Sequence, residues 1–130
     1  VGLMVPVLKD ADALGFGDLA LALADLGARA RTGNLAPDEV KEGTITLTNF
    51  GASGALWGNP IINPPEVAII GTGAVAPRAV ALPGGGVGVR PTMGLSITFD
   101  HRANDGMAAG RFAAAVRAAL ESMNLSQLEF

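Results

Sequence analysis

The sequence contains a single histidine, and its surroundings are the strongest chemical signal in the chain. His101 lies in Asp100-His101-Arg102-Ala103-Asn104-Asp105-Gly106, between an alternating apolar stretch and an amphipathic one. Because an imidazole can take up and return a proton at neutral pH, His101 is a candidate general base. The alternative is a histidine that packs in the core or caps an element. Asp105 can pair with the surroundings of His101, cap the helix that follows, or do both.

Other chemistries have little support. The chain has no cysteine, which excludes disulfides, thiolate nucleophiles and cysteine-based metal sites. With one histidine, no transition-metal site is predicted either. Gly71-Thr-Gly-Ala-Val-Ala76 fits the pattern of a dinucleotide-binding turn, but such a turn must open a helix, and the residues after it are typical of a strand. Gly84-Gly-Gly86 lacks the following residues of a P-loop and predicts a tight turn.

Composition sets the class of protein. With 130 residues, of which 49% are hydrophobic, the chain has the size of one domain. Its net charge of −3, with basic residues scattered singly, argues against a nucleic-acid partner. No apolar run approaches the ~20 residues that cross a bilayer, and no signal peptide is evident, so we expect no membrane and a cytoplasmic location. The apolar excess reflects either an alanine-rich coding bias or surface that lies against other subunits.

Alternation of apolar and polar residues predicts the strands that would position these side chains. The clearest is Thr44–Thr48, which places two aliphatic residues on one face and three threonines on the other. A first strand over Val1–Leu8 contains a proline, which places it at a sheet edge or near a strand end. The remaining predicted strands are Val67–Ile70, Ala74–Leu82, Val87–Arg90 and Met93–Phe99, which ends at Asp100.

Helical spacing predicts two helices and a short helical turn. The first helix runs from Asp18 to about Arg31 and closes at Gly33, and the turn covers Pro37–Val40. The last helix runs from about Asp105 to Met123 and packs an apolar stripe on a sheet. The members of that stripe are Ala109, Phe112, Val116, Leu120 and Met123. This order of elements is that of an α/β (α+β) protein with a mixed open β-sheet covered by helices on one side.

The stretch from Asn49 to Pro65 is too rich in glycine, proline and asparagine for regular structure, and it is long for a loop. Long loops of this kind are often functional. Trp57, the single tryptophan, lies in this stretch and has two interpretations. It is either an anchor for a partner or a contact at the edge of the core.

Four segments in order resemble the dihydrolipoamide acyltransferases, the E2 core subunits of 2-oxo acid dehydrogenase complexes. Asp100–Gly106 is similar to the family's D-H-R-x-x-D-G signature, and the other three segments are Gly2–Asp12, Gly43–Gly51 and Pro60–Gly71. The resemblance implies a chloramphenicol acetyltransferase-like fold. The family's domain is roughly twice as long, so residues 1–123 are expected to be the C-terminal portion of a catalytic domain and residues 124–130 a tail.

The resemblance also implies an activity. Such enzymes move an acyl group between dihydrolipoyl-lysine and coenzyme A, here with His101 as general base and the Thr48 hydroxyl as oxyanion donor. Thr48 has the alternative of being only the last outward threonine of its strand. Asp105 would hold the local structure that orients His101. Thr48, Asn49 and Phe50 would contact coenzyme A, and the lipoyl group would be carried on a lipoyl domain outside this chain.

The implied assembly is a homotrimer with His101 of one subunit facing Thr48 of its neighbour. Trimers would build a cubic or dodecahedral core that binds the E1 and E3 components. The segment Pro60–Val67 favours a pyruvate or branched-chain complex over the succinyl type. Two alternatives stand beside this interpretation: a non-catalytic scaffold fragment for core assembly, and an O-acetyltransferase of the chloramphenicol type.

Overall fold

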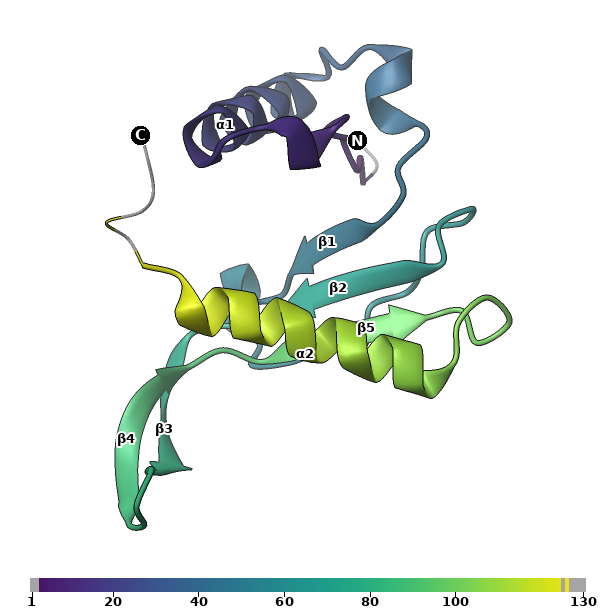
Figure 1. The fold of residues 1–130 in the computed structure, drawn as a ribbon. Helices are drawn as coiled ribbons and strands as arrows, with labels where there is room; N and C mark the ends of the chain where they lie inside the picture. The colour runs from purple at the N-terminus through teal and green to yellow at the C-terminus, as the bar shows by residue number, and fades with distance from the viewer. Residues whose placement is uncertain (1–2, 125, 127–130) are drawn as a thin grey trace. The chain divides into compact units, whose positions relative to one another are not determined.

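The computed structural model describes residues 3–124 and 126. Within that part of the chain, two helices and five strands are joined by three short 3-10 segments, η1 (Ala11–Ala13), η2 (Pro37–Val40) and η3 (Gly51–Ser53) (Figure 1). The helices and strands are α1 (Phe16–Thr32), β1 (Thr46–Asn49), β2 (Ala68–Thr72), β3 (Ala76–Ala81), β4 (Val87–Thr92), β5 (Leu95–Phe99) and α2 (Gly106–Ser122). None of the described helices is long and apolar enough to cross a membrane.

The chain divides into two compact units. The helical unit comprises Val1–Thr44 together with Ala119–Phe130, and the sheet unit comprises Ile45–Ala118. All five strands belong to the sheet unit, as does most of α2. The candidate residues His101, Asp105 and Thr48 therefore lie within one unit.

Helix α1 is close to the predicted helix. It begins two residues before Asp18 and ends one residue after Arg31. Asp18 lies in its first turn, where the positive end of the helix dipole stabilises a carboxylate. Gly33 ends it with φ of 73°, the left-handed conformation that glycine adopts without strain. The predicted turn over Pro37–Val40 is confirmed as η2, with proline at its start.

An ion-pair network joins α1 to η2 inside the helical unit. Arg29 donates to Glu39 with Nη1–Oε2 of 2.5 Å and Nη2–Oε1 of 2.7 Å, and its Nε donates to Asp25 at 2.8 Å. Glu39 Oε2 also accepts from the amide of Ala36 at 2.8 Å. The guanidinium of Arg29 and then this amide hold the pKa of Glu39 down to about 2.

The strand predicted over Val1–Leu8 is wrong for the described residues 3–8, which form no strand. An extended segment becomes a strand only when a neighbouring strand supplies a ladder of hydrogen bonds. Here the Val7 amide donates to the Glu39 carbonyl, 2.7 Å away, and Glu39 belongs to a helical turn. Pro6 has no amide hydrogen to offer. The alternation in the sequence was therefore a sign of extended backbone without a pairing partner.

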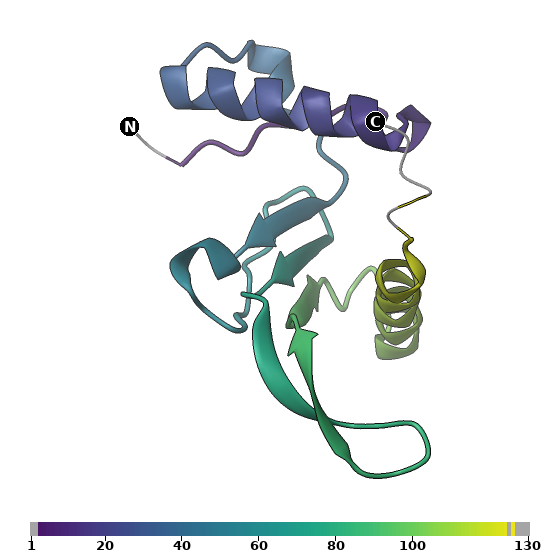
Figure 2. The ribbon, with the colours of Figure 1, turned by 90° about the vertical axis from the view of Figure 1, so that its left-hand side faces the viewer.

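The larger sheet has the strand order β1-β2-β5. β1 runs parallel to β2, and β5 runs antiparallel to it, so the predicted mixed sheet is confirmed. Across the three strands, Thr46 is aligned with Ile69 and Thr98. Two residues further along β1, Thr48 is aligned with Gly71 and Ser96. Helix α2 lies along one face of this sheet (Figures 1 and 2).

Strands β3 and β4 form a separate antiparallel hairpin that pairs Ala76 with Thr92 at its base and Ala81 with Val87 at its tip. The turn between them confirms the prediction made from three consecutive glycines. Gly84, Gly85 and Gly86 have φ values of 86°, 98° and 86°, a region that side chains strongly disfavour.

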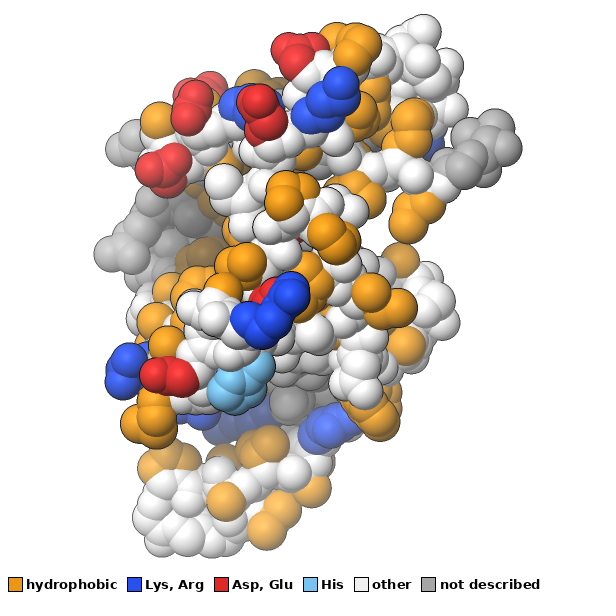
Figure 3. All heavy atoms as spheres, turned by 90° about the vertical axis from the view of Figure 1, so that its right-hand side faces the viewer, with side chains coloured by type: hydrophobic (Ala, Val, Ile, Leu, Met, Phe, Trp, Pro, Cys, Tyr) orange, Lys and Arg blue, Asp and Glu red, His pale blue; other side chains and the backbone are white. Residues whose placement is uncertain are grey.

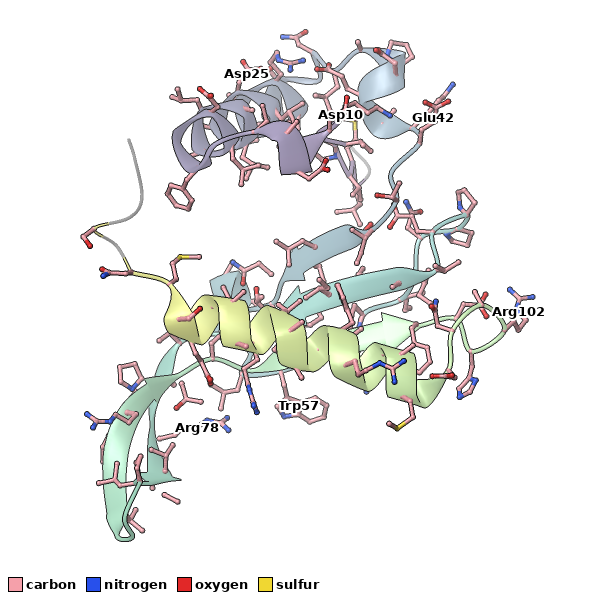
Figure 4. All side chains as sticks on the ribbon, viewed as in Figure 1. Asp10, Asp25, Glu42, Trp57, Arg78 and Arg102 are labelled. Atoms are coloured by element: carbon pink, nitrogen blue, oxygen red, sulfur yellow. The ribbon has the colours of Figure 1, made fainter. Side chains whose placement is uncertain are left out.

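Few apolar side chains are buried. Among the described residues, Leu26 and Ile69 are the buried hydrophobic side chains, each 5% exposed. Trp57 is 68% exposed and projects away from the sheet (Figure 4), so its interpretation as a core contact is wrong. The larger members of the α2 stripe stay partly exposed, with Phe112 at 41%. Much of the apolar excess is thus exposed in this chain, and both of its interpretations, coding bias and subunit surface, stay predictions.

Candidate active site

His101 lies in a turn that links β5 to α2, and the backbone on both sides of it is held. The Asp100 amide donates to the Val67 carbonyl at 2.8 Å, which extends the pairing of β5 with β2 by one bond. The Asp100 carbonyl accepts from the amides of Ala103 and Asn104, both at 3.0 Å. The turn is therefore ordered by main-chain hydrogen bonds on either side of the histidine.

The Asp100 side chain adds a second layer of bonds. Its Oδ1 accepts from the Arg102 amide at 2.9 Å and from Arg102 Nε at 3.0 Å, while Oδ2 accepts from Nη2 at 2.7 Å. Oδ1 with the amide two residues on makes an Asx-turn. Hydrogen bonds from the Arg102 guanidinium, and then from its amide, lower the pKa of Asp100 to about 2, so its carboxylate is charged at neutral pH.

The imidazole of His101 is exposed at the surface of the sheet unit (Figure 3). Its ring lies against that of Phe99, with centroids 5.5 Å apart and planes tilted by 40°. Across the described residues, no hydrogen bond joins the imidazole to another side chain. The carboxylates of Asp100 and Asp105 are bonded to other groups, and the imidazole is accessible at the surface.

Asp105 caps helix α2. Its Oδ1 accepts from the Ala108 amide at 2.7 Å, and its carbonyl accepts from the Ala109 amide at 3.1 Å. These are the bonds of an N-cap residue, so the capping interpretation is confirmed. A part for Asp105 in orienting His101 stays a prediction.

Thr48 lies on the inward face of β1, so the description of it as an outward threonine is wrong. Thr46, on the same face, is 9% exposed and donates from Oγ1 to Glu66 Oε2 at 2.6 Å, whereas Leu47 on the other face is 70% exposed. Thr48 is half-buried. It is aligned with Gly71 on β2, which in turn is aligned with Ser96 on β5. Its hydroxyl is therefore partly sheltered from water, which strengthens a hydrogen bond made there.

Asn49 and Phe50 shape the end of β1. Asn49 Oδ1 accepts from the Gly51 amide at 2.8 Å and so starts η3. The Phe50 ring lies over Gly71, where an added Cβ would come within 2.5 Å of Cε2. Both residues have a structural task, and a further task as contacts for coenzyme A stays a prediction.

The structure does not bring His101 and Thr48 together in one chain. Ser96 aligns with Thr48 through β2, and His101 follows Ser96 by five residues toward the opposite end of the sheet. At about 3.3 Å per residue and about 4.8 Å between strands, the Cα atom of Phe99, at the end of β5, is about 14 Å from that of Thr48, and His101 follows in the turn beyond it. That separation is far beyond the reach of a hydrogen bond or of one bound thioester carbonyl.

Two contacts at the candidate residues were not expected from the sequence. The pairing of Asp100 with Arg102 has a local signal, because aspartate often accepts from the amide two residues on. The bond between Thr46 and Glu66 has no local signal, since 20 residues separate them. No group of three metal-ligating side chains gathers in the described part of the chain.

The chain matches a family model and many curated proteins. The model for the catalytic domain of 2-oxoacid dehydrogenase acyltransferases matches residues 1–128. The acetyltransferase component of the pyruvate dehydrogenase complex of Mycobacterium bovis is 48% identical over 124 residues, and the human mitochondrial succinyltransferase component of the 2-oxoglutarate dehydrogenase complex is 41% identical over 128. These alignments cover 92% and 98% of this chain but 22% and 28% of the relatives, about a quarter of their length.

Solved structures show the same fold. A probable dihydrolipoamide acetyltransferase from Listeria monocytogenes superposes with a TM-score of 0.92 at 31% identity, over 99% of this chain and 55% of that one. Dihydrolipoamide acetyltransferase from Azotobacter vinelandii gives 0.88 at 34% identity, over 93% and 49%. The cubic core of a pyruvate dehydrogenase multienzyme complex gives 0.88 at 33% identity, over 93% and 49%.

These matches agree with the four motifs and with the arrangement of the mixed sheet, and they confirm the expected fold. The chain corresponds to about half of the solved catalytic chains. It belongs to the family of 2-oxo acid dehydrogenase acyltransferase catalytic domains.

Proposed function

We propose that this chain supplies the catalytic histidine and the oxyanion donor of a dihydrolipoamide acyltransferase. The proposal depends on one observation in a chain of this family: an ordered turn exposes His101 to solvent, and no side chain is hydrogen-bonded to its imidazole. The substrates are a dihydrolipoyl group and coenzyme A, and the reaction exchanges one thioester for another.

The proton moves in two steps. An imidazole nitrogen of His101 takes the proton from the attacking thiol as its sulfur bonds to the thioester carbonyl carbon. The resulting oxyanion is stabilised by the Thr48 hydroxyl. When the intermediate collapses, the carbon–sulfur bond to the other thiol breaks and His101 returns the proton to that sulfur. General base catalysis of this kind contributes ~10²–10⁴-fold, and one oxyanion donor contributes ~10²–10³-fold.

The active site forms between two copies of the chain. The placement of His101 beyond the end of β5 that lies away from Thr48 supports this, because a single copy then does not bring both groups to one carbonyl. Solved relatives assemble as cores of multienzyme complexes, one of them cubic. A homotrimer in which His101 of one copy faces Thr48 of the next satisfies both observations, and trimers then build a cubic or dodecahedral core that receives the E1 and E3 components.

Thr48, Asn49 and Phe50 form the part of the site that contacts coenzyme A. The side chains fit this task in chemistry: a half-buried hydroxyl, an exposed amide whose oxygen is already bonded to Gly51, and a ring fixed over Gly71. The lipoyl group arrives on a lipoyl domain outside this chain. In this proposal residues 1–123 are the C-terminal portion of the catalytic domain and residues 124–130 its tail.

Asp105 acts by holding the start of α2 rather than by proton transfer. In the Azotobacter vinelandii enzyme, the roles of a serine, a histidine and an asparagine in catalysis have been investigated, and that histidine and asparagine are four residues apart. His101 and Asp105 have the same spacing. Because Asp105 caps α2, it fixes the far end of the turn that carries His101.

The acyl group is acetyl or branched-chain in this proposal. The segment Pro60–Val67 supports this choice by its resemblance to the pyruvate and branched-chain types. The location is expected to be cytoplasmic in this proposal; the human relative is named mitochondrial.

The test measures acyl transfer to dihydrolipoamide from acetyl-CoA, isobutyryl-CoA and succinyl-CoA, with His101→Ala as the variant and Asn34→Ala, in the helical unit, as the control. We expect a fall of ~10²–10⁴-fold for His101→Ala and parental rates for the control. Transfer to a hydroxylated acceptor in place of dihydrolipoamide would identify an O-acetyltransferase. A folded parent without either activity would leave assembly as the role of the chain.

A further inference from the structure

The turn that carries His101 contains an ion pair that is unequally exposed. The side chain of Asp100 is 23% exposed, whereas that of Arg102 is 92% exposed. The carboxylate is therefore the sheltered member of the pair, and the Arg102 side chain projects from the turn into solvent (Figure 4). Three of the Asp100–Arg102 bonds come from the guanidinium, and they engage both carboxylate oxygens.

An exposed ion pair adds little to the stability of a fold, because water screens it and long side chains lose freedom in forming it. The fourth bond has a different effect. The Arg102 amide donates to Asp100 Oδ1 at 2.9 Å, and His101 is the residue enclosed between them. This Asx-turn restrains the backbone dihedrals of His101, and these set the direction of its Cα–Cβ bond.

The histidine has few other restraints. Its ring contacts that of Phe99, and its residue is exposed. A turn without the carboxylate would keep the bonds from Ala103 and Asn104 to the Asp100 carbonyl but would lose the bond that closes over His101. The orientation of the imidazole therefore depends on the Asp100 side chain more than on packing.

We infer that Asp100 is the positioning residue for His101 and that Arg102 acts through it by fixing both oxygens of the carboxylate. This inference rests on the proposed function for its effect on catalysis, but its structural part does not. Neither residue touches the reacting atoms. Their part is to hold the base in the direction from which it reaches the thiol, and a misplacement of about 1 Å can cost ~10²-fold in rate.

Three variants separate the bonds. Asp100→Ala removes all of them, Asp100→Asn keeps an oxygen that can accept from the Arg102 amide, and Arg102→Gln keeps the Asx-turn without the guanidinium. Matched controls are Asp12→Ala in η1 and Arg111→Gln on α2, which make the same chemical changes away from the turn. We expect kcat to fall ~10²-fold in Asp100→Ala and less than ~10-fold in the other two, with KM and thermal midpoints unchanged.

The single histidine provides a readout that needs no activity. In NMR spectra of the full chain, the His101 ring protons should show contacts to the Phe99 ring in the parent, in Asp100→Asn and in the controls. In Asp100→Ala these contacts should weaken and the resonances should move toward those of an unstructured peptide.

Each outcome decides the inference. Unchanged ring contacts and unchanged kcat in Asp100→Ala would overturn it. So would a fall in kcat that only follows the loss of folded protein, or an Asp100→Asn variant as impaired as Asp100→Ala. If the parent itself lacks transfer activity, the proposed function fails, while the ring contacts still support or overturn the positioning role of Asp100.

Discussion

Mixing two inactive variants tests whether the active site lies between copies of the chain. His101→Ala and Thr48→Ala each remove one of the two groups that the proposed reaction needs. In one chain the register of β1, β2 and β5 puts Phe99 about 14 Å from Thr48, and His101 lies in the turn beyond Phe99. A bound thioester carbonyl must lie ~3 Å from both the oxyanion donor and the attacking thiol, so one copy cannot supply both.

The activity expected in the mixture follows from the fraction of interfaces that contain both an intact His101 and an intact Thr48. If His101 of one copy meets Thr48 of the next around a closed ring, an equal mixture of the two variants has intact pairs at about one quarter of its interfaces. Each variant alone should retain ~10⁻² or less of the parental rate, since each lacks a base or a donor. A mixture dissociated and reassembled together should therefore recover about one quarter of that rate.

The assay is acyl transfer from acetyl-CoA to dihydrolipoamide, measured before and after reassembly at equal total protein. The control is the same procedure on each variant alone, which should recover no activity. Activity in the reassembled mixture no greater than the mean of the separate variants would refute the shared site. It would then follow that Thr48 is not the donor or that one chain holds the complete site.

Other predictions concern local structure. Glu39→Gln should destabilise the helical unit. The pKa of Glu39 is lowered from 4.5 to about 2 by its ion pair with Arg29. This ion pair therefore stabilises the fold above pH 4.5, and the stabilisation is lost as the pH falls toward 2. Acid titration by circular dichroism should show a smaller loss over that range in the variant, and an identical curve would contradict the role of the pair. Gly71→Ala should destabilise the sheet unit by ~1–3 kcal/mol in urea unfolding, because its Cβ would meet the Phe50 ring, and the companion change Phe50→Leu should recover part of this. Thr46→Val should cost ~1–3 kcal/mol through the lost bond to Glu66, whereas Thr44→Val, outside the strand, should cost little.

Much of the fold could be read from local pattern. The alternation of Met93–Phe99 and the three glycines after Pro83 predict a strand and a turn that the structure contains, since both depend on the chain's own dihedral preferences. Val1–Leu8 fails because a strand is defined by its neighbour, and residues 3–8 have no neighbouring strand.

The candidate site could be predicted only in its parts. A lone histidine beside an element boundary is visible in the sequence, and so is the capping position of Asp105. The distance between His101 and Thr48 is not, because it depends on β5 running antiparallel to β2 while β1 runs parallel to it. The inward face of β1 was also unpredictable: period two separates Thr46 from Leu47 but does not say which of them is buried.

From the scarcity of buried apolar side chains we expect folding to be coupled to the association that the proposed assembly requires. With Leu26 and Ile69 as the buried hydrophobic residues of the described chain, a lone copy removes little apolar surface from water when it folds. Surfaces such as Leu47, Val87 and Val89, each at least 70% exposed, would add to that burial wherever other chains cover them. The melting temperature of such an assembly is expected to rise with protein concentration.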